Sequence, residues 1–204
     1  MHQYGREFRP FSIGPFTIVP EGDEIQAGSG IPLIMGRKGA FGSGEHETTA
    51  GCLEFLASMS ALKGCSALDL GSGTGILAIA AARLGAARVV ALDIDWPASL
   101  SCKDNVLLNG MESRVDILCS ELAAVAMTSF DLILANIYAD IHLMLAEEMV
   151  AMTRPGGLLI ISGIPLQDKF EVQQRFLREG CEQLDSRIGE EYASYMLRRS
   201  ELRP

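Results

Sequence analysis

The glycine-rich segment Gly71–Gly75 (GSGTG) is the first candidate site, because it follows a predicted strand and precedes a predicted helix. Glycines at such a place let the backbone turn sharply and come close to a ligand. Dinucleotide-binding turns read G-x-G-x-x-G and seat a pyrophosphate on a helix N-terminus, whereas this chain has G-x-G-x-G preceded by Asp69. The Asp69 carboxylate would repel a pyrophosphate and would suit a ligand with an ammonium group. A tight turn without any ligand is the structural alternative.

A second carboxylate, Asp93, ends the next predicted strand, in the sequence ALDID. A carboxylate there can accept hydrogen bonds from both hydroxyls of a ribose. The alternative role is to cap the helix that begins near Trp96, but Asp95 lies nearer to that start. We therefore assign ribose binding to Asp93 and the cap to Asp95, and we place Ile94 in the same cofactor-binding group. Together with the glycine segment, Asp93 predicts binding of S-adenosylmethionine.

Asn136 follows a predicted strand at residues 130–135, in the sequence ANIY. The end of that strand should lie next to the ligand crevice, because the crevice of an open α/β sheet lies at the carboxyl ends of its strands. A carboxamide can accept a hydrogen bond from an incoming amine and orient its lone pair. We predict this catalytic role for Asn136 and expect Tyr138 to form a pocket wall. A turn asparagine is the structural alternative.

The segment AFGSGEHETT, residues 40–49, precedes a predicted helix. It combines two close glycines, an aromatic residue and a pair of threonines. Capping of the helix by Thr48 and packing of Phe41 in the core could explain part of this pattern. The combination is too unusual for capping alone, and we interpret the segment as part of the site.

The elements that must position these residues alternate along the chain from about residue 41 onwards. Short apolar strands separated by helices of about a dozen residues predict βαβ units and a parallel sheet. The last two β-like stretches, at residues 183–188 and 192–198, are too close for a crossover helix, so we expect them to form an antiparallel hairpin. The sequence therefore predicts an α/β fold with a mostly parallel sheet of about seven strands, closed by that hairpin.

The first 39 residues differ from the rest in their prolines and glycines, with short β-like pieces at residues 16–19 and 31–35. The stretch is too short and too interrupted to bury a core of its own. We expect an extended lead-in at residues 1–39, followed by the main domain at residues 40–204.

The composition excludes several classes of protein. With 48% apolar residues the 204-residue chain can bury a sizeable core, so disorder is excluded. A net charge of −9 makes passive nucleic-acid binding unfavourable, because that binding needs clustered cations. The five cysteines show no CxxC pair and the three histidines are scattered, so we expect no metal site or disulfide framework. We expect a cytoplasmic protein, because no signal peptide and no apolar run of ~20 residues is present.

Read together, these motifs resemble a family of bacterial enzymes. The chain is similar to the methyltransferases of large-subunit ribosomal protein eleven, which are class I S-adenosylmethionine-dependent protein lysine methyltransferases. The resemblance covers about Phe11 to the C-terminus. It rests on AFGSGEHETT, where the family reads close to AFGTGxHxTT, and on LDLGSGTGILAIAAARLGA, ALDID, LILANIYADIH and PGGLLIISGI.

The resemblance implies a Rossmann-like class I methyltransferase fold, S-adenosylmethionine as cofactor and S-adenosylhomocysteine as product. Carried over by position, the residues that match cofactor-contacting residues of the family are Thr49, Gly71, Asp93 and Asn136. Phe41, Gly42 and Gly73 lie in the same motifs and are expected to line the same pocket. The family also has an N-terminal domain that recruits the ribosomal protein, and we expect this chain to lack it. A protein substrate is expected, but the resemblance does not identify it or the oligomeric state.

Three other interpretations stay open from the sequence. The chain could methylate a small molecule or an RNA, although the lack of a basic patch argues against RNA. It could also be a cofactor-binding module without activity, against which the intact Asn136 motif argues. A nicotinamide dehydrogenase is disfavoured by the spacing of the glycines.

Overall fold

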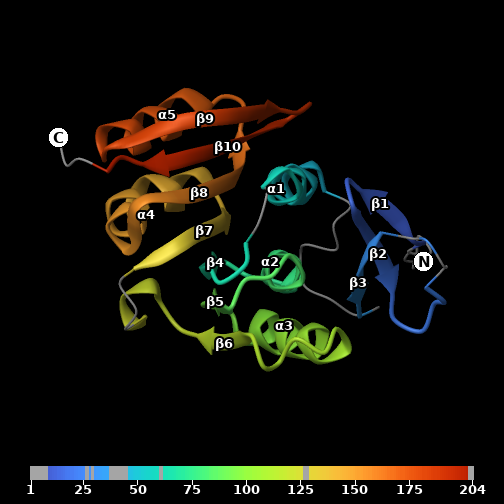
Figure 1. Cartoon of the computed structure of the whole chain (residues 1–204). Coiled ribbons are helices and arrows are strands. Elements are labelled where there is room, and N and C mark those ends of the chain that lie inside the picture. Colours follow the sequence, from blue (N-terminus) through green and yellow to red (C-terminus); the bar gives the residue numbers. More distant parts are fainter. Residues whose placement is uncertain are drawn as a thin grey trace, which may run out of the picture.

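The structure, a computed structural model, describes residues 9–25, 28, 30–36, 46–59, 62–125 and 129–201. Within these residues a seven-stranded sheet forms the centre of the molecule, and a three-stranded sheet lies to one side of it (Figure 1). No helix in the described part of the chain is long and apolar enough to cross a membrane.

The large sheet has the strand order β6-β5-β4-β7-β8-β10-β9. Its strands are β4 (Ser66–Leu70), β5 (Arg88–Asp93), β6 (Val115–Cys119), β7 (Phe130–Asn136), β8 (Thr153–Pro165), β9 (Cys181–Ile188) and β10 (Tyr192–Arg199). The strands from β4 to β8 pair in parallel, whereas β10 runs antiparallel to both β8 and β9. The predicted fold, a mostly parallel sheet of seven strands closed by an antiparallel hairpin, is confirmed.

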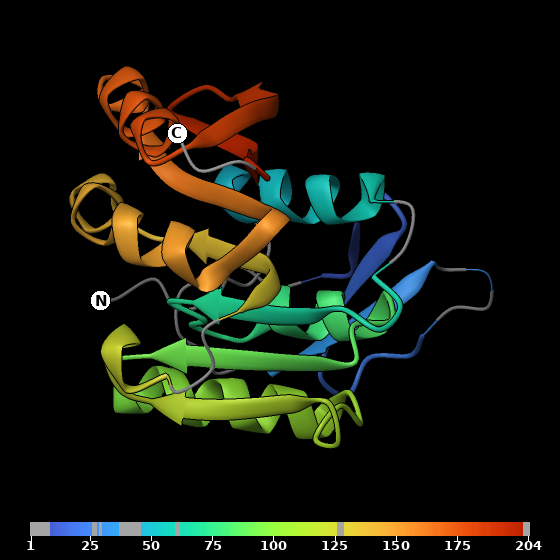
Figure 2. The same cartoon turned by 60° about the vertical axis from the view of Figure 1, so that its left-hand side comes forward.

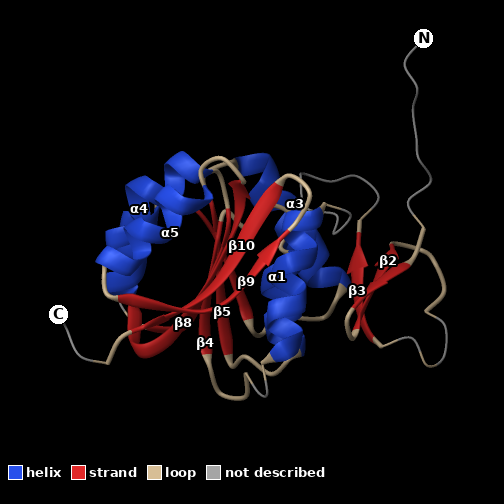
Figure 3. Ribbon diagram, turned by 90° about the horizontal axis from the view of Figure 1, so that it is seen from above, coloured by secondary structure: helices blue, strands red, loops and turns tan. Residues whose placement is uncertain are grey.

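Helices cover both faces of this sheet, as a parallel sheet with two apolar faces requires. Figure 3 shows α4 and α5 on one side of the sheet and α1 and α3 on the other. The helices are α1 (Glu47–Ser58), α2 (Ile76–Arg83), α3 (Trp96–Leu108), α4 (Ala139–Met152) and α5 (Lys169–Arg178), with a short 3-10 helix η1 (Leu122–Ala124) after β6. Each face has its own apolar cluster, with residues of α1, α2 and α3 in one and residues of α4 and α5 in the other.

The small sheet near the N-terminus contains β1 (Phe11–Ile13), β2 (Phe16–Pro20) and β3 (Ile31–Met35) in the order β1-β2-β3. Its buried side chains Phe16, Ile18 and Leu33 belong to the same apolar cluster as α1 and α2. Asn109, which directly follows α3, fixes β3 by accepting a hydrogen bond from the Ile34 N–H at 2.9 Å and donating one to the Ile34 carbonyl at 2.7 Å. The small sheet therefore packs against the helical layer of the large one.

Strand register decides where functional side chains can meet. Leu70 of β4 pairs with Leu92 of β5 and with Ala135 of β7, so the next residue of each strand lies at the same edge of the sheet. Asp93 and Asn136 are two of these residues. In Figure 2 the arrowheads of β4, β5 and β6 point to one side of the molecule, which is the carboxyl edge of the sheet.

The strand β8 begins at Thr153, before the sequence Pro155-Gly156-Gly157, although proline and glycine are unfavourable inside a strand. Thr153 pairs with Phe130 of β7 before the register shifts. The Thr153 hydroxyl also donates to the Met149 carbonyl at 2.9 Å, which closes the last turn of α4.

Candidate functional site

A cavity of about 900 Å³ opens at the carboxyl edge of the large sheet. It lies where β4, β5 and β7 end, between the first residues of α1, the first half of α4 and the segment around η1. This is the place at which open α/β sheets bind ligands. Of the described residues that line it, none is lysine or arginine, whereas Asp93, Asp95, Glu121 and Glu148 contribute carboxylates. The charge of the lining therefore favours a cationic ligand over a pyrophosphate.

The glycine turn after β4 forms the floor of this cavity. Gly71 has a φ of +70°, and a Cβ there would lie 2.4 Å from Cγ2 of Ile137. Gly75 has a φ of +78° and caps the start of α2, with the Sγ of Cys102 only 2.5 Å from where its Cβ would be. Both positions therefore require glycine. The turn is also fixed by the Gly71 N–H, which donates to the Leu92 carbonyl at 2.8 Å.

Asp93 lines the cavity from the end of β5 and holds the glycine turn. Its Oδ2 accepts the Gly73 N–H at 2.8 Å, and its Oδ1 accepts the Asp95 N–H at 2.9 Å. Each carboxylate oxygen can accept two hydrogen bonds, so each retains acceptor capacity for a ligand hydroxyl. Asp95 accepts the Ala98 N–H at 3.2 Å and caps α3, as expected. Ile94 lines the cavity with 78% of its surface exposed.

The structure gives Asp69 a different place from the one we expected. Asp69 is buried, it is not among the residues that line the cavity, and its Oδ2 accepts the Ala78 N–H of α2 at 3.0 Å. Burial raises the pKa of this carboxyl to about 7; the Ala78 hydrogen bond opposes the rise and the charge of Asp93 adds to it. Asp69 thus anchors the start of α2 beneath the glycine turn.

Asn136 and Thr49 meet at one wall of the cavity, although they lie 87 residues apart. The Nδ2 of Asn136 donates to Oγ1 of Thr49 at 3.3 Å. Sequence reasoning missed Gly163 of β8, which completes this wall. Gly163 has a φ of +81°, and a Cβ there would lie 2.4 Å from the Ile137 carbonyl oxygen and 3.1 Å from Oδ1 of Asn136. The signal for Gly163 was its place in the matched segment PGGLLIISGI.

Three rings lie around the mouth of the cavity, those of His46, Tyr138 and Tyr192. Tyr138 precedes α4, and 79% of its surface is exposed. His46 caps α1: its Nδ1 accepts the Thr48 N–H at 3.4 Å and lies 2.9 Å from Oγ1 of Thr48. The rings of His46 and Tyr192 meet edge to face, with their centroids 5.1 Å apart. Sequence reasoning missed Tyr192, because it lies in a late hairpin without a motif.

The cavity thus brings together the predicted site residues Thr49, Gly71, Gly73, Asp93, Ile94, Asn136 and Tyr138. The predicted residues Phe41 and Gly42 lie outside the described part of the chain. Within that part, no group of three or more His, Cys, Asp or Glu side chains could hold a metal ion.

A family model and curated relatives of the chain carry the same family name. The family model described as "Ribosomal protein L11 methyltransferase (PrmA)" matches residues 1–200. A protein of Exiguobacterium sp. with the name ribosomal protein L11 methyltransferase is 34% identical over 200 residues, which are 97% of this chain and 64% of that protein. One of the same name from Pelobacter propionicus is 38% identical over 199 residues, or 95% of this chain and 64% of its own length. The chain therefore spans less than two thirds of these relatives.

Solved structures give the same result. The crystal structure of a ribosomal protein L11 methylase from Lactobacillus delbrueckii subsp. bulgaricus matches with a TM-score of 0.86 and 27% identity, over 95% of this chain and 100% of that one. The tRNA m1G37 methyltransferase of M. jannaschii matches with a TM-score of 0.67 and 16% identity, over 94% of this chain and 72% of that one. The second likeness shows the fold alone.

Proposed function

The chain belongs to the ribosomal protein L11 methyltransferase family, and on this premise we propose that it transfers a methyl group from S-adenosylmethionine to an amine nitrogen of a protein. The observation that carries the proposal is the meeting of Asp93, the glycine turn and Asn136 around one cavity without a cationic side chain among its described lining residues.

The cavity fits this cofactor. Its described lining residues include none of the cations that a pyrophosphate would need, and at Gly71 the backbone itself faces the cavity, because Ile137 leaves no room for a side chain there. Asp93 would hold the ribose with its remaining acceptor capacity, and Gly71, Gly73, Ile94 and Thr49 would form the surrounding surface. When bound, the cofactor would supply a methyl group that is attached to a positively charged sulfur. The sulfur is a good leaving group, because it becomes a neutral thioether.

The chain itself must orient the attacking nitrogen and exclude water. The amine would first lose its extra proton to solvent, and the transfer would then exchange the sulfur–carbon bond of the methyl group for a nitrogen–carbon bond. We assign orientation to Asn136, whose Oδ1 can accept a hydrogen bond from the amine while Nδ2 is held by Thr49. Tyr138 would form an outer wall. Because a protonated amine has no lone pair, the amine must lose a proton before it attacks.

His142 is unsuited to take that proton. It is buried away from the cavity lining, and its Nε2 donates to the Ser162 carbonyl at 2.9 Å. Burial lowers its pKa to about 4, although the Ser162 hydrogen bond and the charge of Asp140 oppose the shift. We therefore assign it a structural role and assign no side-chain base to the reaction.

Ribosomal protein L11 is the acceptor that the names of the relatives supply, and we propose it as the first acceptor to test. The acidic lining of the cavity supports a cationic acceptor such as a lysine or an N-terminal amine over RNA. We also propose a cytoplasmic location, which is supported by the five cysteines being free, all of them within the described residues.

The proposal is tested by incubating the chain with radiolabelled S-adenosylmethionine and purified L11, and in parallel with a bacterial lysate. We expect label on nitrogen in a protein, as mass spectrometry of its peptides would show, and label in L11 would identify L11 as the acceptor. Label in another protein only would replace L11 as acceptor and keep the activity. Label in RNA or in no macromolecule would overturn protein methylation. The matched control is Asn136→Ala, which should bind the cofactor and transfer little label.

A further inference from the structure

The turn between β9 and β10 is attached to the first residue of α1 at the edge of the cavity. The Glu47 carboxylate accepts three backbone N–H groups of that turn: Oε2 accepts from Glu190 at 2.8 Å, and Oε1 accepts from Glu191 at 2.9 Å and from Tyr192 at 3.0 Å. The donors lie 143 to 145 residues away in sequence. A side chain that fixes three successive backbone groups of a distant turn fixes the position of that turn.

Two further features favour this attachment. Glu47 is the first residue of α1, where a carboxylate also interacts favourably with the helix dipole. Gly189 precedes the three donors, and a Cβ there would lie 2.0 Å from Oε2 of Glu47. Only glycine therefore leaves room for the carboxylate at its observed place.

The attachment places Tyr192 at the cavity. Tyr192 is half-buried, it lines the cavity together with His46, Asn136 and Gly163, and its ring meets that of His46 at an interplanar angle of 67°. His46 comes directly before Glu47, so one short segment holds both the backbone and the ring of Tyr192. Tyr192 and Asn136 both line the cavity, and both contact the start of α1, Tyr192 through Glu47 and Asn136 through Thr49. The proposed function has its acceptor side at Asn136.

We propose that Tyr192 is an acceptor-binding residue that offers its ring to the ammonium group of the incoming amine, and that Glu47 is the residue that positions it. The inference rests on the proposed function and deepens it. An amine in water arrives protonated, and a methylated amine is a cation again after transfer. An aromatic face attracts such cations, and does so more strongly where water is excluded.

The charge around the turn agrees with a cationic acceptor. Glu190 and Glu191 are both exposed beside Tyr192. They would attract a basic segment of a protein toward the cavity mouth, at long range and in a salt-dependent manner. Tyr192 would then contact the single amine that enters.

The experiment uses two ligands that differ at the reacting atom. S-adenosylhomocysteine lacks the methyl group, whereas sinefungin carries an amine-bearing carbon in place of the methylated sulfur. Its ammonium group therefore points toward the acceptor side. Calorimetry on wild type, Tyr192→Leu, Tyr192→Phe and Glu47→Ala gives the dissociation constant of each ligand, and circular dichroism checks that each variant is folded.

We expect Tyr192→Leu to weaken sinefungin binding by about threefold to tenfold and to change S-adenosylhomocysteine binding by less than twofold. Tyr192→Phe keeps the ring and should bind both ligands as wild type does. Glu47→Ala should show the same split as Tyr192→Leu, in smaller measure. If Glu47→Ala does not fold, Glu47→Gln, which retains an acceptor oxygen, takes its place with the same expectation.

If a folded Tyr192→Leu variant binds both ligands more weakly to the same extent, or binds both as wild type does, Tyr192 is only structural. A split in Tyr192→Leu without one in the Glu47 variant would remove the positioning role of Glu47. A wild-type chain that binds neither ligand would overturn the proposed function itself, which is a separate outcome.

Discussion

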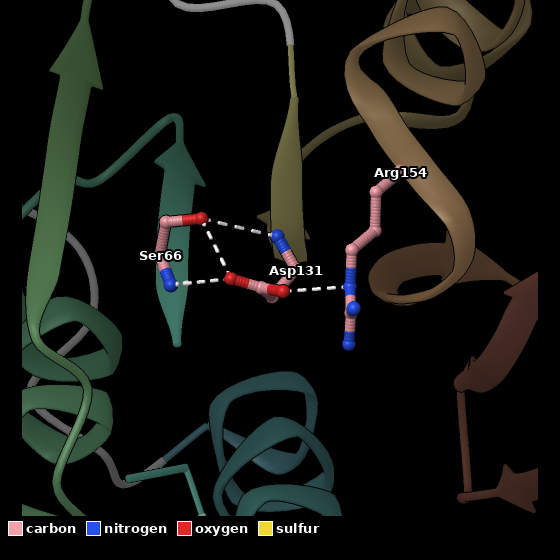
Figure 4. Close-up of polar contacts among 3 residues, drawn as sticks. All are labelled: Ser66, Asp131 and Arg154. Atoms are coloured by element: carbon pink, nitrogen blue, oxygen red, sulfur yellow. Dashed lines mark hydrogen bonds and ion pairs between the residues drawn. The ribbon is translucent and has the colours of Figure 1, made fainter. Parts of the chain in front are cut away.

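The two edges of the parallel sheet place carboxylates in opposite environments. At the amino edge, Asp131 of β7 accepts the N–H of Ser66 at 2.7 Å and its hydroxyl at 2.8 Å, and it pairs with Nε of Arg154 at 2.6 Å (Figure 4). At the carboxyl edge, the Asp93 carboxylate holds two backbone N–H groups and faces a cavity. The sheet thus has a polar cluster of paired side chains at its amino edge and a site with free acceptor capacity at its carboxyl edge.

The pKa values of two aspartates follow this difference. Burial alone would raise the pKa of Asp131, but the Ser66 hydrogen bonds and the Arg154 charge outweigh it and the pKa is lowered. Asp69, on the neighbouring strand β4, has no cationic partner among the causes of its shift, and burial raises its pKa to about 7. The partners of Asp131 thus favour its charged form, whereas burial disfavours the charged form of Asp69.

Among variants that compare the two edges of the sheet, the largest effect is expected at Asn136, at the carboxyl edge. Asn136→Ala removes the oriented carboxamide, and loss of alignment can cost about 100-fold in rate. The affinity for S-adenosylhomocysteine should fall much less, because Asp93 and the glycine turn remain. The measurement is kcat on the labelled acceptor beside the cofactor Kd. A near-normal kcat with a greatly weakened Kd would make Asn136 a cofactor residue only.

The next effect is expected at Asp93. Asp93→Ala should lose the charge-assisted hydrogen bonds to the ribose hydroxyls, and also the one that holds Gly73 of the glycine turn and the one to the Asp95 N–H. We expect a loss of roughly 1.5–3 kcal/mol of cofactor binding. Calorimetry with S-adenosylhomocysteine measures it. Unchanged affinity in a folded variant would refute the assignment of Asp93 to the ribose.

Asp131→Asn is the matched variant at the amino edge. The change removes the charge that Ser66 and Arg154 satisfy, and it should lower the free energy of unfolding by about 1–2 kcal/mol. Cofactor affinity should stay as in wild type, since Asp131 lies at the edge of the sheet opposite to the cavity. Urea unfolding gives the free energy of unfolding, and calorimetry gives the cofactor affinity. An affinity loss as large as that of Asp93→Ala would show that the two edges are not independent.

A further effect is one of pH. Folded Asp69 holds its proton up to about pH 7, whereas the carboxyl in the unfolded chain loses it near the ordinary value of 3.8. Between these values the folded state binds more protons, so this group makes the free energy of unfolding fall as the pH rises. Asp69→Asn removes the effect. The free energy of unfolding of wild type minus that of the variant, measured by urea unfolding, should therefore decrease from pH 4 to pH 7. A difference that does not change with pH would contradict the raised pKa.

Asp131 should give the opposite dependence when the same measurement is extended below pH 4, in the comparison of wild type with Asp131→Asn. Its folded pKa is lowered, so its contribution is present above the ordinary value of 3.8 and is lost as the pH falls through the folded value. His142 also titrates below neutrality, but it is common to all these proteins and cancels in the differences.

Much of this site follows from the sequence because parallel strands end at a common edge. Asp93 and Asn136 could be placed together from their positions after two apolar strands, and the register of the sheet confirms that placement. Asp69 could not be placed from its motif alone. The two-residue alternation of a strand puts Leu68 and Leu70 on one face of β4 and Asp69 on the other, toward α2. Alternation within β4 was the available signal.

Contacts between distant segments were beyond reach of the sequence. Glu47 bonds to a turn 143 to 145 residues later, and nothing in its local sequence distinguishes it from a carboxylate that only favours a helix start. Gly163 and Tyr192 likewise become part of the site only when β8 and β10 pair antiparallel beside β7. Local patterns predict elements and edges, whereas the closing hairpin decides which late residues reach the cavity.

The cofactor assignment of the cavity is tested most directly by calorimetric titration of the wild-type chain with S-adenosylhomocysteine, and separately with NADH. We predict saturable binding of one S-adenosylhomocysteine per chain and no heat from NADH. The binding of S-adenosylhomocysteine should be weakened in Asp93→Ala and unchanged in Asp131→Asn. Binding of NADH, or S-adenosylhomocysteine binding that is indifferent to Asp93, would contradict the assignment of the cavity at the carboxyl edge.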